Sequence, residues 1–136
     1  MFTHVDHVGF AVRSIDDAVA FYSEKFGITG WERIDVPERH TTVAVAWVGG
    51  QMLELIAPTS DQAAFARYLA EKGPGMHHMA YRVEDIAATL AELKARGVQL
   101  IDEVPRPGIH NTLVAFLHPK SCMGVLVELV QHQGKV

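Results

Sequence analysis

The chain lacks most of the features that mark secreted, membrane-spanning or nucleic-acid-binding proteins. It has a single cysteine, Cys122, which excludes an internal disulfide framework. No apolar run approaches the ~20 residues that span a bilayer, and no basic segment followed by an apolar one indicates a signal peptide. Lys and Arg number 12 against 16 Asp and Glu, and the net charge of -4 argues against a nucleic-acid footprint. We therefore expect a cytoplasmic protein that binds neither nucleic acid nor membrane.

What the sequence does contain is an internal repeat. Residues 5–19, VDHVGFAVRSIDDAV, are similar to residues 76–90, MHHMAYRVEDIAATL. This alignment pairs His7 with His78 at the same position of the two copies. A repeat of this length predicts a duplicated fold, which must be recognised before any single element is interpreted.

The hydrophobic periodicity predicts the same order of elements in each half, namely a strand, a helix and three strands. In the first half we expect strands at 4–12, 31–36, 42–48 and 51–57, and a helix that begins at Ser14 and ends at Gly27. In the second half we expect strands at 76–83, 98–104, 112–118 and 124–131, a helix at 85–96 and a loop at 105–108. The 136 residues are thus predicted to form one α+β domain of two βαβββ modules, with repeat 1 at about 3–58, a linker helix at 59–74 and repeat 2 at about 75–132.

One glutamate stands among apolar residues in each half. Glu54 lies in Met-Leu-Glu-Leu-Ile and Glu128 in Leu-Val-Glu-Leu-Val, each at the centre of an expected strand. A single Glu of this kind can simply face solvent from the wet side of a sheet. Two at corresponding places of a repeat favour a functional role, because a buried Glu is almost always paired or bound to metal.

The histidines divide in the same way. A lone His on a strand is more often a structural residue than a ligand, but His7 and His78 are repeat partners. His77 must point to the opposite sheet face from His78, because side chains alternate along a strand. The remaining histidines have no repeat partner and are expected at the surface or in loops: His4, His40, His110, His118 and His132.

Two imidazoles and two carboxylates that converge would suit a divalent transition ion. Four protein ligands, His7, Glu54, His78 and Glu128, leave open positions at which a bidentate substrate can chelate. We expect such an ion to act as a Lewis acid that makes the C–H beside a carbonyl acidic.

Four segments carry a resemblance to a known family: Asp6–Gly9 (DHVG), Gly49–Pro58 (GGQMLELIAP), Gly75–Asp85 (GMHHMAYRVED) and Phe116–Leu129 (FLHPKSCMGVLVEL). With them the chain resembles the vicinal-oxygen-chelate superfamily (glyoxalase, bleomycin resistance protein and dioxygenase) and, within it, the methylmalonyl-CoA epimerase family. The resemblance implies a homodimer, with an incomplete barrel around a metal site in each domain. It also implies interconversion of (R)- and (S)-methylmalonyl-CoA by abstraction of the C2 proton through a metal-stabilised enolate.

Carried over to this sequence, the resemblance implies the metal ligands His7, Glu54, His78 and Glu128 and a Co2+, Mn2+, Ni2+ or Zn2+ ion. Some relatives have an acid on the third strand where this chain has Val43, so a catalytic role passes to Glu54 or Glu128. Lys120, Asn111 and Arg106 are candidates for contacts with an acyl-CoA substrate, although each also fits a solvated loop.

Two other functions remain open at this point. One is a lactoylglutathione lyase of the glyoxalase I type, which shares the two-His, two-Glu ligand set. The other is a non-catalytic small-molecule-binding protein of the same fold, which would lack bound metal. The sequence does not separate methylmalonyl-CoA from ethylmalonyl-CoA, because one methylene contributes only ~1–3 kcal/mol of discrimination.

Overall fold

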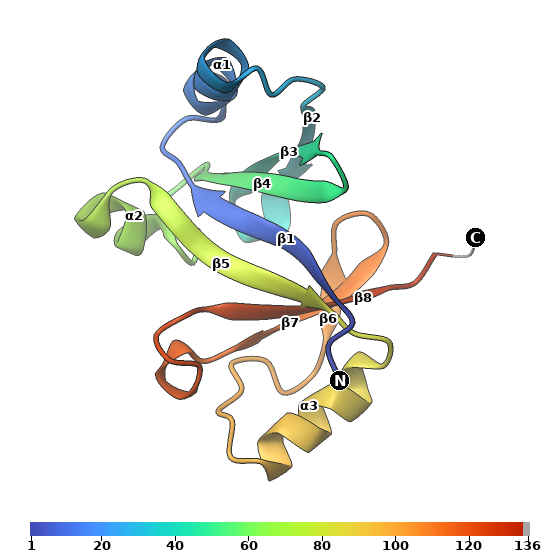
Figure 1. Ribbon diagram of the computed structural model, residues 1–136. Coiled ribbons are helices and arrows are strands. Elements are labelled where there is room, and N and C mark those ends of the chain that lie inside the picture. The colour runs from blue at the N-terminus through green and yellow to red at the C-terminus, as the bar shows by residue number, and fades with distance from the viewer. Residues whose placement is uncertain (135–136) are drawn as a thin grey trace. The chain divides into compact units, whose positions relative to one another are not determined.

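A computed structural model describes residues 1–134, which form three α-helices, eight β-strands and two short 3-10 helices (Figure 1). The chain divides into two compact units. Unit 1 combines the N-terminal segment Met1–His7 with the chain from His78 onwards, and unit 2 is the continuous segment Val8–His77. The first strand, β1 (His4–Ala11), crosses from unit 1 into unit 2.

Unit 2 holds most of repeat 1. Its elements after β1 are α1 (Ile15–Phe26), β2 (Glu32–Val36), η1 (Pro37–Arg39), β3 (Thr41–Val48), β4 (Gln51–Pro58) and α2 (Ala66–Lys72). Strands β2, β3 and β4 are antiparallel neighbours, and the Gly49-Gly50 pair joins β3 to β4. The strands expected at 42–48 and 51–57 are confirmed to within one residue. Of the linker helix expected at 59–74, only the α2 residues are α-helical.

Helix α1 forms where its capping residues and apolar face predict it. The Asp17 N–H donates to the Ser14 side chain at the N-cap (3.1 Å), and Gly27 ends the helix with φ 69, a left-handed conformation that suits glycine. Ile15, at the start of the helix, packs in one cluster with Ala44 of β3 and Leu55 of β4. The α1 side of this sheet is therefore the apolar core of unit 2.

Strand β5 (Gly75–Arg82) crosses from unit 2 into unit 1 at His78. Unit 1 then repeats the plan of unit 2 with α3 (Ile86–Ala95), β6 (Arg106–Gly108), β7 (Thr112–Leu117), η2 (Pro119–Ser121) and β8 (Val127–His132). Strand β8 pairs in parallel with β5 and antiparallel with β7, which pairs in turn with β6. Ile86 and Leu90 of α3 pack in one cluster with Leu117 of β7 and Leu129 of β8. Ile86 is the repeat partner of Ile15, so the same position fixes the helix to the sheet in both units.

The prediction of a strand at 98–104 is wrong. Only Leu100 forms an isolated bridge, to Leu117, and the strand beside β7 is instead β6, in the segment expected to be a loop. The prolines there are tolerated because β6 is the edge strand and pairs on one side only. Gly108 permits the close pairing, since a Cβ at this position would lie 2.5 Å from Thr112 Oγ1.

The described residues contain no helix of the length and apolarity needed to cross a membrane. Eight strands and three helices in the order predicted from the repeat confirm the α+β class, apart from the displaced strand in the second half.

Candidate metal centre and active site

Three potential metal ligands converge in unit 1. The Nε2 atoms of His7 and His78 lie 3.1 Å apart. Glu128 Oε1 lies 3.1 Å from the first nitrogen and 3.2 Å from the second. All three side chains are buried, with 4–6% of each residue exposed. The three atoms thus form a nearly equilateral triangle of electron-pair donors.

The strands of unit 1 place these side chains. His7 is on β1, His78 on β5 and Glu128 on β8, and the parallel pairing of β5 with β8 sets Ala80 opposite Glu128. Side chains alternate along β8, so Leu129 enters the core beneath α3 while Glu128 points to the opposite face. A carboxylate can therefore be buried in an apolar strand without disturbing the core of the unit.

The charge state of Glu128 suits metal binding. Burial disfavours its charged form, but the adjacent imidazoles of His7 and His78 outweigh this effect and hold the pKa of the carboxyl far below its ordinary value. Within residues 1–134, Glu128 Oε1 is buried and accepts no hydrogen bond, despite the two nitrogens beside it. A buried anionic oxygen of this kind needs a cationic partner.

A divalent ion fits this donor set. Two ligand atoms at right angles in an octahedron with bonds of about 2.1 Å lie roughly 3.0 Å apart. The three observed separations of 3.1–3.2 Å match that value closely. Imidazole nitrogen and carboxylate oxygen together are ligands of Mn2+, Co2+, Ni2+ and Zn2+. The observed cluster of His, His and Glu is therefore chemically and geometrically suited to a divalent metal.

A second layer of polar side chains supports His7. Its Nδ1 lies 2.8 Å from Asp6 Oδ2, and His132 Nε2 lies 2.6 Å from Asp6 Oδ1. Burial disfavours the charged form of Asp6, but the hydrogen bonds from His7 and His132 outweigh it and lower the pKa of its carboxyl. The sequence argument missed Asp6, whose only signal was its place beside His7. It placed His132 at the surface, where the structure has it, but did not predict its contact with Asp6.

Glu54, the fourth predicted ligand, belongs to unit 2. It is buried on β4, and its cross-strand neighbour on β3 is Val45. Leu55, the next residue, packs beneath α1, so Glu54 points to the sheet face away from that helix. His7, Glu54 and His78 each offer one ligand atom that can bind a metal ion.

His77 has a different environment from its neighbour His78. Its ring contacts Phe65, with ring centroids 5.5 Å apart, and Tyr68, at 6.4 Å. All three of these side chains belong to unit 2. His77 is therefore an aromatic packing residue, while His78 reaches Glu128.

The three residues predicted to contact substrate lie in different settings within unit 1. Arg106, on β6, lies over the Phe116 ring at 5.7 Å, and Phe116 in turn contacts the His78 ring at 5.9 Å. Asn111 is in the β6–β7 turn with φ 56, a conformation that Asn tolerates better than most residues. Lys120 is exposed in η2. Of the three, Arg106 is linked to the ligand cluster by a continuous chain of contacts.

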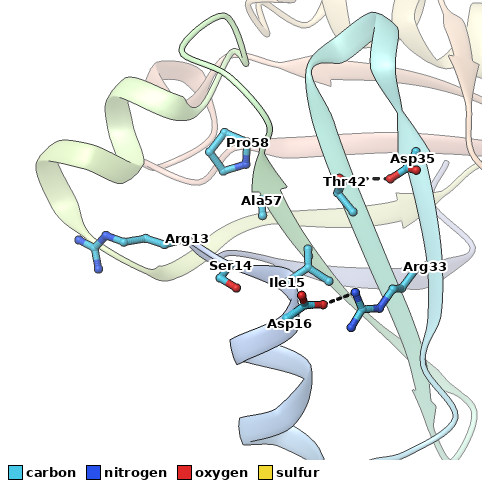
Figure 2. A pocket seen from close by; sticks show the side chains of 9 residues that line it. All are labelled: Arg13, Ser14, Ile15, Asp16, Arg33, Asp35, Thr42, Ala57 and Pro58. Atoms are coloured by element: carbon cyan, nitrogen blue, oxygen red, sulfur yellow. Dashed lines mark hydrogen bonds and ion pairs between the residues drawn. The ribbon is translucent and has the colours of Figure 1, made fainter.

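A pocket of about 430 Å³ in unit 2 lies between the start of α1 and strands β2–β4 (Figure 2). Its charged residues are partly paired with one another, because Arg33 forms an ion pair with Asp16 and the Thr42 hydroxyl donates to Asp35 (3.3 Å). Ala57 in its wall shares the α1 face of β4 with Leu55, so Glu54 points away from this pocket. None of the predicted metal ligands lines this pocket.

The sequence matches the model of the Glyoxalase/Bleomycin resistance protein/Dioxygenase superfamily over residues 6–116. The chain therefore belongs to this superfamily, and its α+β fold and its cluster of His and Glu agree with that class.

Proteins with similar sequences identify the family within this superfamily. The chain is 38% identical to the uncharacterized protein YqjC of Bacillus subtilis, over 96% of this chain and 93% of that protein. It is 36% identical to human mitochondrial methylmalonyl-CoA epimerase, over 93% of this chain and 73% of that protein. It is also 36% identical to the ethylmalonyl-CoA/methylmalonyl-CoA epimerase of Cereibacter sphaeroides, over 96% and 99%. The chain belongs to the methylmalonyl-CoA epimerase family.

Solved structures agree with this assignment. A methylmalonyl-CoA epimerase in complex with methylmalonyl-CoA and NH4+ has a TM-score of 0.92 and 32% identity, over 98% of this chain and 97% of that one. A variant of the Streptomyces coelicolor epimerase in complex with 2-nitronate-propionyl-CoA matches with the same values. The resemblance inferred from the sequence and the glyoxalase-like α+β fold are thereby confirmed.

Proposed function

We propose that this protein epimerises methylmalonyl-CoA at C2 and uses a divalent metal ion to do so. The observation that carries the proposal is the convergence of His7, His78 and Glu128 within 3.2 Å of one another, with a buried Glu128 oxygen that accepts no hydrogen bond in the described chain. Relatives and structural neighbours named as epimerases of this substrate support the choice of reaction.

The proposed ligands are His7, Glu54, His78 and Glu128. The first, third and fourth are supported by their mutual distances, and Glu54 by its burial and its equivalence to Glu128 in the repeat. A bound divalent ion supplies Lewis acidity, which makes a proton beside a chelated carbonyl easier to remove. The chain supplies the burial that keeps water from competing for these ligands.

We propose that a carboxylate of this ligand set also moves the C2 proton. The face of β3 beside Glu54 carries the buried, apolar Val43 and Val45, and neither can accept a proton. Glu54 and Glu128 are the two carboxylates of the proposed ligand set, and a carboxylate can act as a general base at neutral pH. The base is thus assigned to one of these two carboxylates.

Replacing Glu54 with Gln tests this assignment. We expect Glu54→Gln to keep the metal, since a Gln oxygen can still coordinate, and to lower the C2 exchange rate by roughly 10²-fold or more if Glu54 is the base. Metal content and exchange rate are measured on the same sample. Unchanged turnover with metal still bound would exclude Glu54 and leave Glu128 as the base.

Arg106 is the proposed contact for a negatively charged group of the acyl-CoA. Its guanidinium lies against Phe116, whose ring adjoins His78, and it is 3.7 Å from Asp102, an ion pair that is partly exposed. Arginine suits this role because it presents a rigid fork of donors to carboxylate or phosphate. Asn111 and Lys120 remain proposed contacts on the sequence resemblance alone.

The deciding experiment is exchange of the C2 proton of methylmalonyl-CoA in deuterated water, followed by mass spectrometry, with Co2+-loaded protein. We expect metal-dependent incorporation of one deuterium, and ethylmalonyl-CoA in parallel measures selectivity. No exchange, together with conversion of a glutathione hemithioacetal, would instead establish a lactoylglutathione lyase. Failure to retain any divalent ion after reconstitution would point to a non-catalytic binding protein.

We further propose that the two repeats form one domain and that the protein is a homodimer. One domain predicts a single calorimetric unfolding transition whose calorimetric and van't Hoff enthalpies agree. A dimer predicts a light-scattering mass of twice the 15.0 kDa chain. Two separated transitions, or a monomer mass, would contradict the respective proposal.

A further inference from the structure

The Asp6 carboxylate is held at both of its oxygens by histidines. Oδ2 is 2.8 Å from His7 Nδ1, and Oδ1 is 2.6 Å from His132 Nε2. The Asp6 side chain is 10% exposed and that of His7 is 6% exposed, so the contact between these two residues is well shielded from water. All three residues lie in unit 1.

These contacts determine which nitrogen of His7 carries the proton. An ionised carboxylate can only accept hydrogen bonds, so the His7 Nδ1–H must donate to Asp6. A neutral imidazole has one N–H, and Nε2 is then left with its lone pair. That is the atom that lies 3.1 Å from both His78 Nε2 and Glu128 Oε1.

His132 anchors the same carboxylate from β8. It is the last residue of that strand, four residues after Glu128. Its Nε2–H donates to Asp6 Oδ1, and its side chain is 34% exposed. Strand β8 therefore carries one proposed ligand and also the group that fixes Asp6, the partner of another ligand.

We infer that Asp6, held by His132, is a positioning residue that locks His7 in the tautomer able to bind a metal through Nε2. The inference rests on the proposed metal-dependent function. The inference distinguishes the two histidine ligands. His7 is preceded by Asp6, which holds its ring, whereas the residue at the same repeat position before His78 is His77, which packs against Phe65. Partners of this kind orient a ligand and raise its affinity for metal.

The test compares Asp6→Asn, Asp6→Ala and His132→Ala with wild type. Asp61→Asn, at an exposed aspartate, is the matched control. Co2+ affinity is measured by calorimetric titration and the coordination by the cobalt absorption spectrum. We expect both Asp6 variants to bind Co2+ roughly 10- to 100-fold more weakly than wild type and to show an altered spectrum. The Co2+ affinity of His132→Ala should fall by less than about tenfold. The control should match wild type. An Asp6→Ala protein with wild-type Co2+ affinity would overturn the inference.

A second measurement needs neither metal nor activity. Long-range ¹H–¹⁵N spectra of the metal-free protein report which imidazole nitrogen carries the proton, and a His7→Gln sample assigns the His7 signals. We expect His7 to be protonated at Nδ1 in wild type and to populate the Nε2–H form in Asp6→Ala. His7 protonated at Nε2 in wild type would refute the inference. A wild-type protein that shows the Nδ1–H form but no C2 exchange would refute the epimerase proposal and leave the role of Asp6 standing.

Discussion

His77 and His78 are neighbours in sequence with opposite surroundings. His78 has its Nε2 within 3.2 Å of a buried carboxylate oxygen, whereas the His77 ring packs against Phe65 and Tyr68. Strand geometry alone separates the two, because adjacent side chains leave the backbone on opposite faces. Which of the two histidines contacts Glu128 is therefore decided by its position on the strand and not by its residue type.

The two residues should respond differently to the same substitution. We expect His78→Gln to lower Co2+ affinity by more than about 100-fold, which exceeds the usual effect of losing a residue that only supports a ligand. We expect His77→Gln to leave Co2+ affinity within about twofold, with calorimetric titration as the measurement for both variants. Equal losses in the two variants would mean that the alternation argument misassigns the ligand.

At the level of single residues, the sequence predicted the ligand cluster but not the residues Asp6 and His132 that hold His7 in place. Repeat equivalence selected His7, His78 and Glu128, because the duplicated strands impose the same constraint twice. Asp6 and His132 have no repeat partner with the same role, so nothing in the repeat distinguishes them. Their contact joins residues at opposite ends of the chain and depends on tertiary structure that local patterns do not encode.

The helices of the two units begin in the same way with different residues. Ser14 caps α1 by accepting from the Asp17 N–H, and Asp85 caps α3 by accepting from the Ala88 N–H, each at 3.1 Å. A side-chain acceptor satisfies a backbone donor that would otherwise lack a partner in the first turn. Both caps were predictable, since Ser and Asp are favoured at this position and an apolar helical pattern follows.

Removing either cap should destabilise the protein without affecting the metal site. We expect Ser14→Ala and Asp85→Ala each to lower the free energy of unfolding by about 1 kcal/mol, measured by urea denaturation. Ser23→Ala, inside α1, is the control and should be neutral or slightly stabilising, because Ala has the higher helix propensity. A cap variant that unfolds at the same urea concentration as wild type would show that its hydrogen bond contributes nothing.

The strand beside β7 shows where prediction from sequence fails at the level of elements. Residues 98–104 contain apolar residues that fit a strand, yet only Leu100 makes a bridge. Arg106–Gly108 contains a proline and a glycine, which usually indicate a loop. Two features permit the pairing of β6 with β7. β6 is an edge strand, so one side of it needs no hydrogen bonds, and Gly108 has no side chain that would collide with Thr112.

Metal binding should stabilise the whole molecule. An ion that binds only the folded state at 100 times its dissociation constant adds about 2.7 kcal/mol to the free energy of unfolding. For a chain of this size that corresponds to a rise in melting temperature of roughly 10 °C. We expect scanning calorimetry to show this rise on adding Co2+ to the metal-free protein and its loss on adding a chelator.

His78→Gln is the control for this measurement. At the Co2+ concentration that stabilises wild type, the variant should melt within about 2 °C of its metal-free temperature, because a dissociation constant raised 100-fold leaves a stabilisation of only about 0.4 kcal/mol. A similar rise in both proteins would place the stabilising ion elsewhere.

The division of the chain has a consequence for how the protein is made. Unit 2 is continuous from Val8 to His77, so all of its residues are available once that segment has left the ribosome. Unit 1 joins Met1–His7 to Glu128, which follows 121 residues after His7 in the sequence. At 5–20 residues per second the N-terminal segment waits roughly 6–25 seconds for its partner strands. Until Glu128 has been made, unit 1 is incomplete and its strand edges are open, which is a condition that favours aggregation.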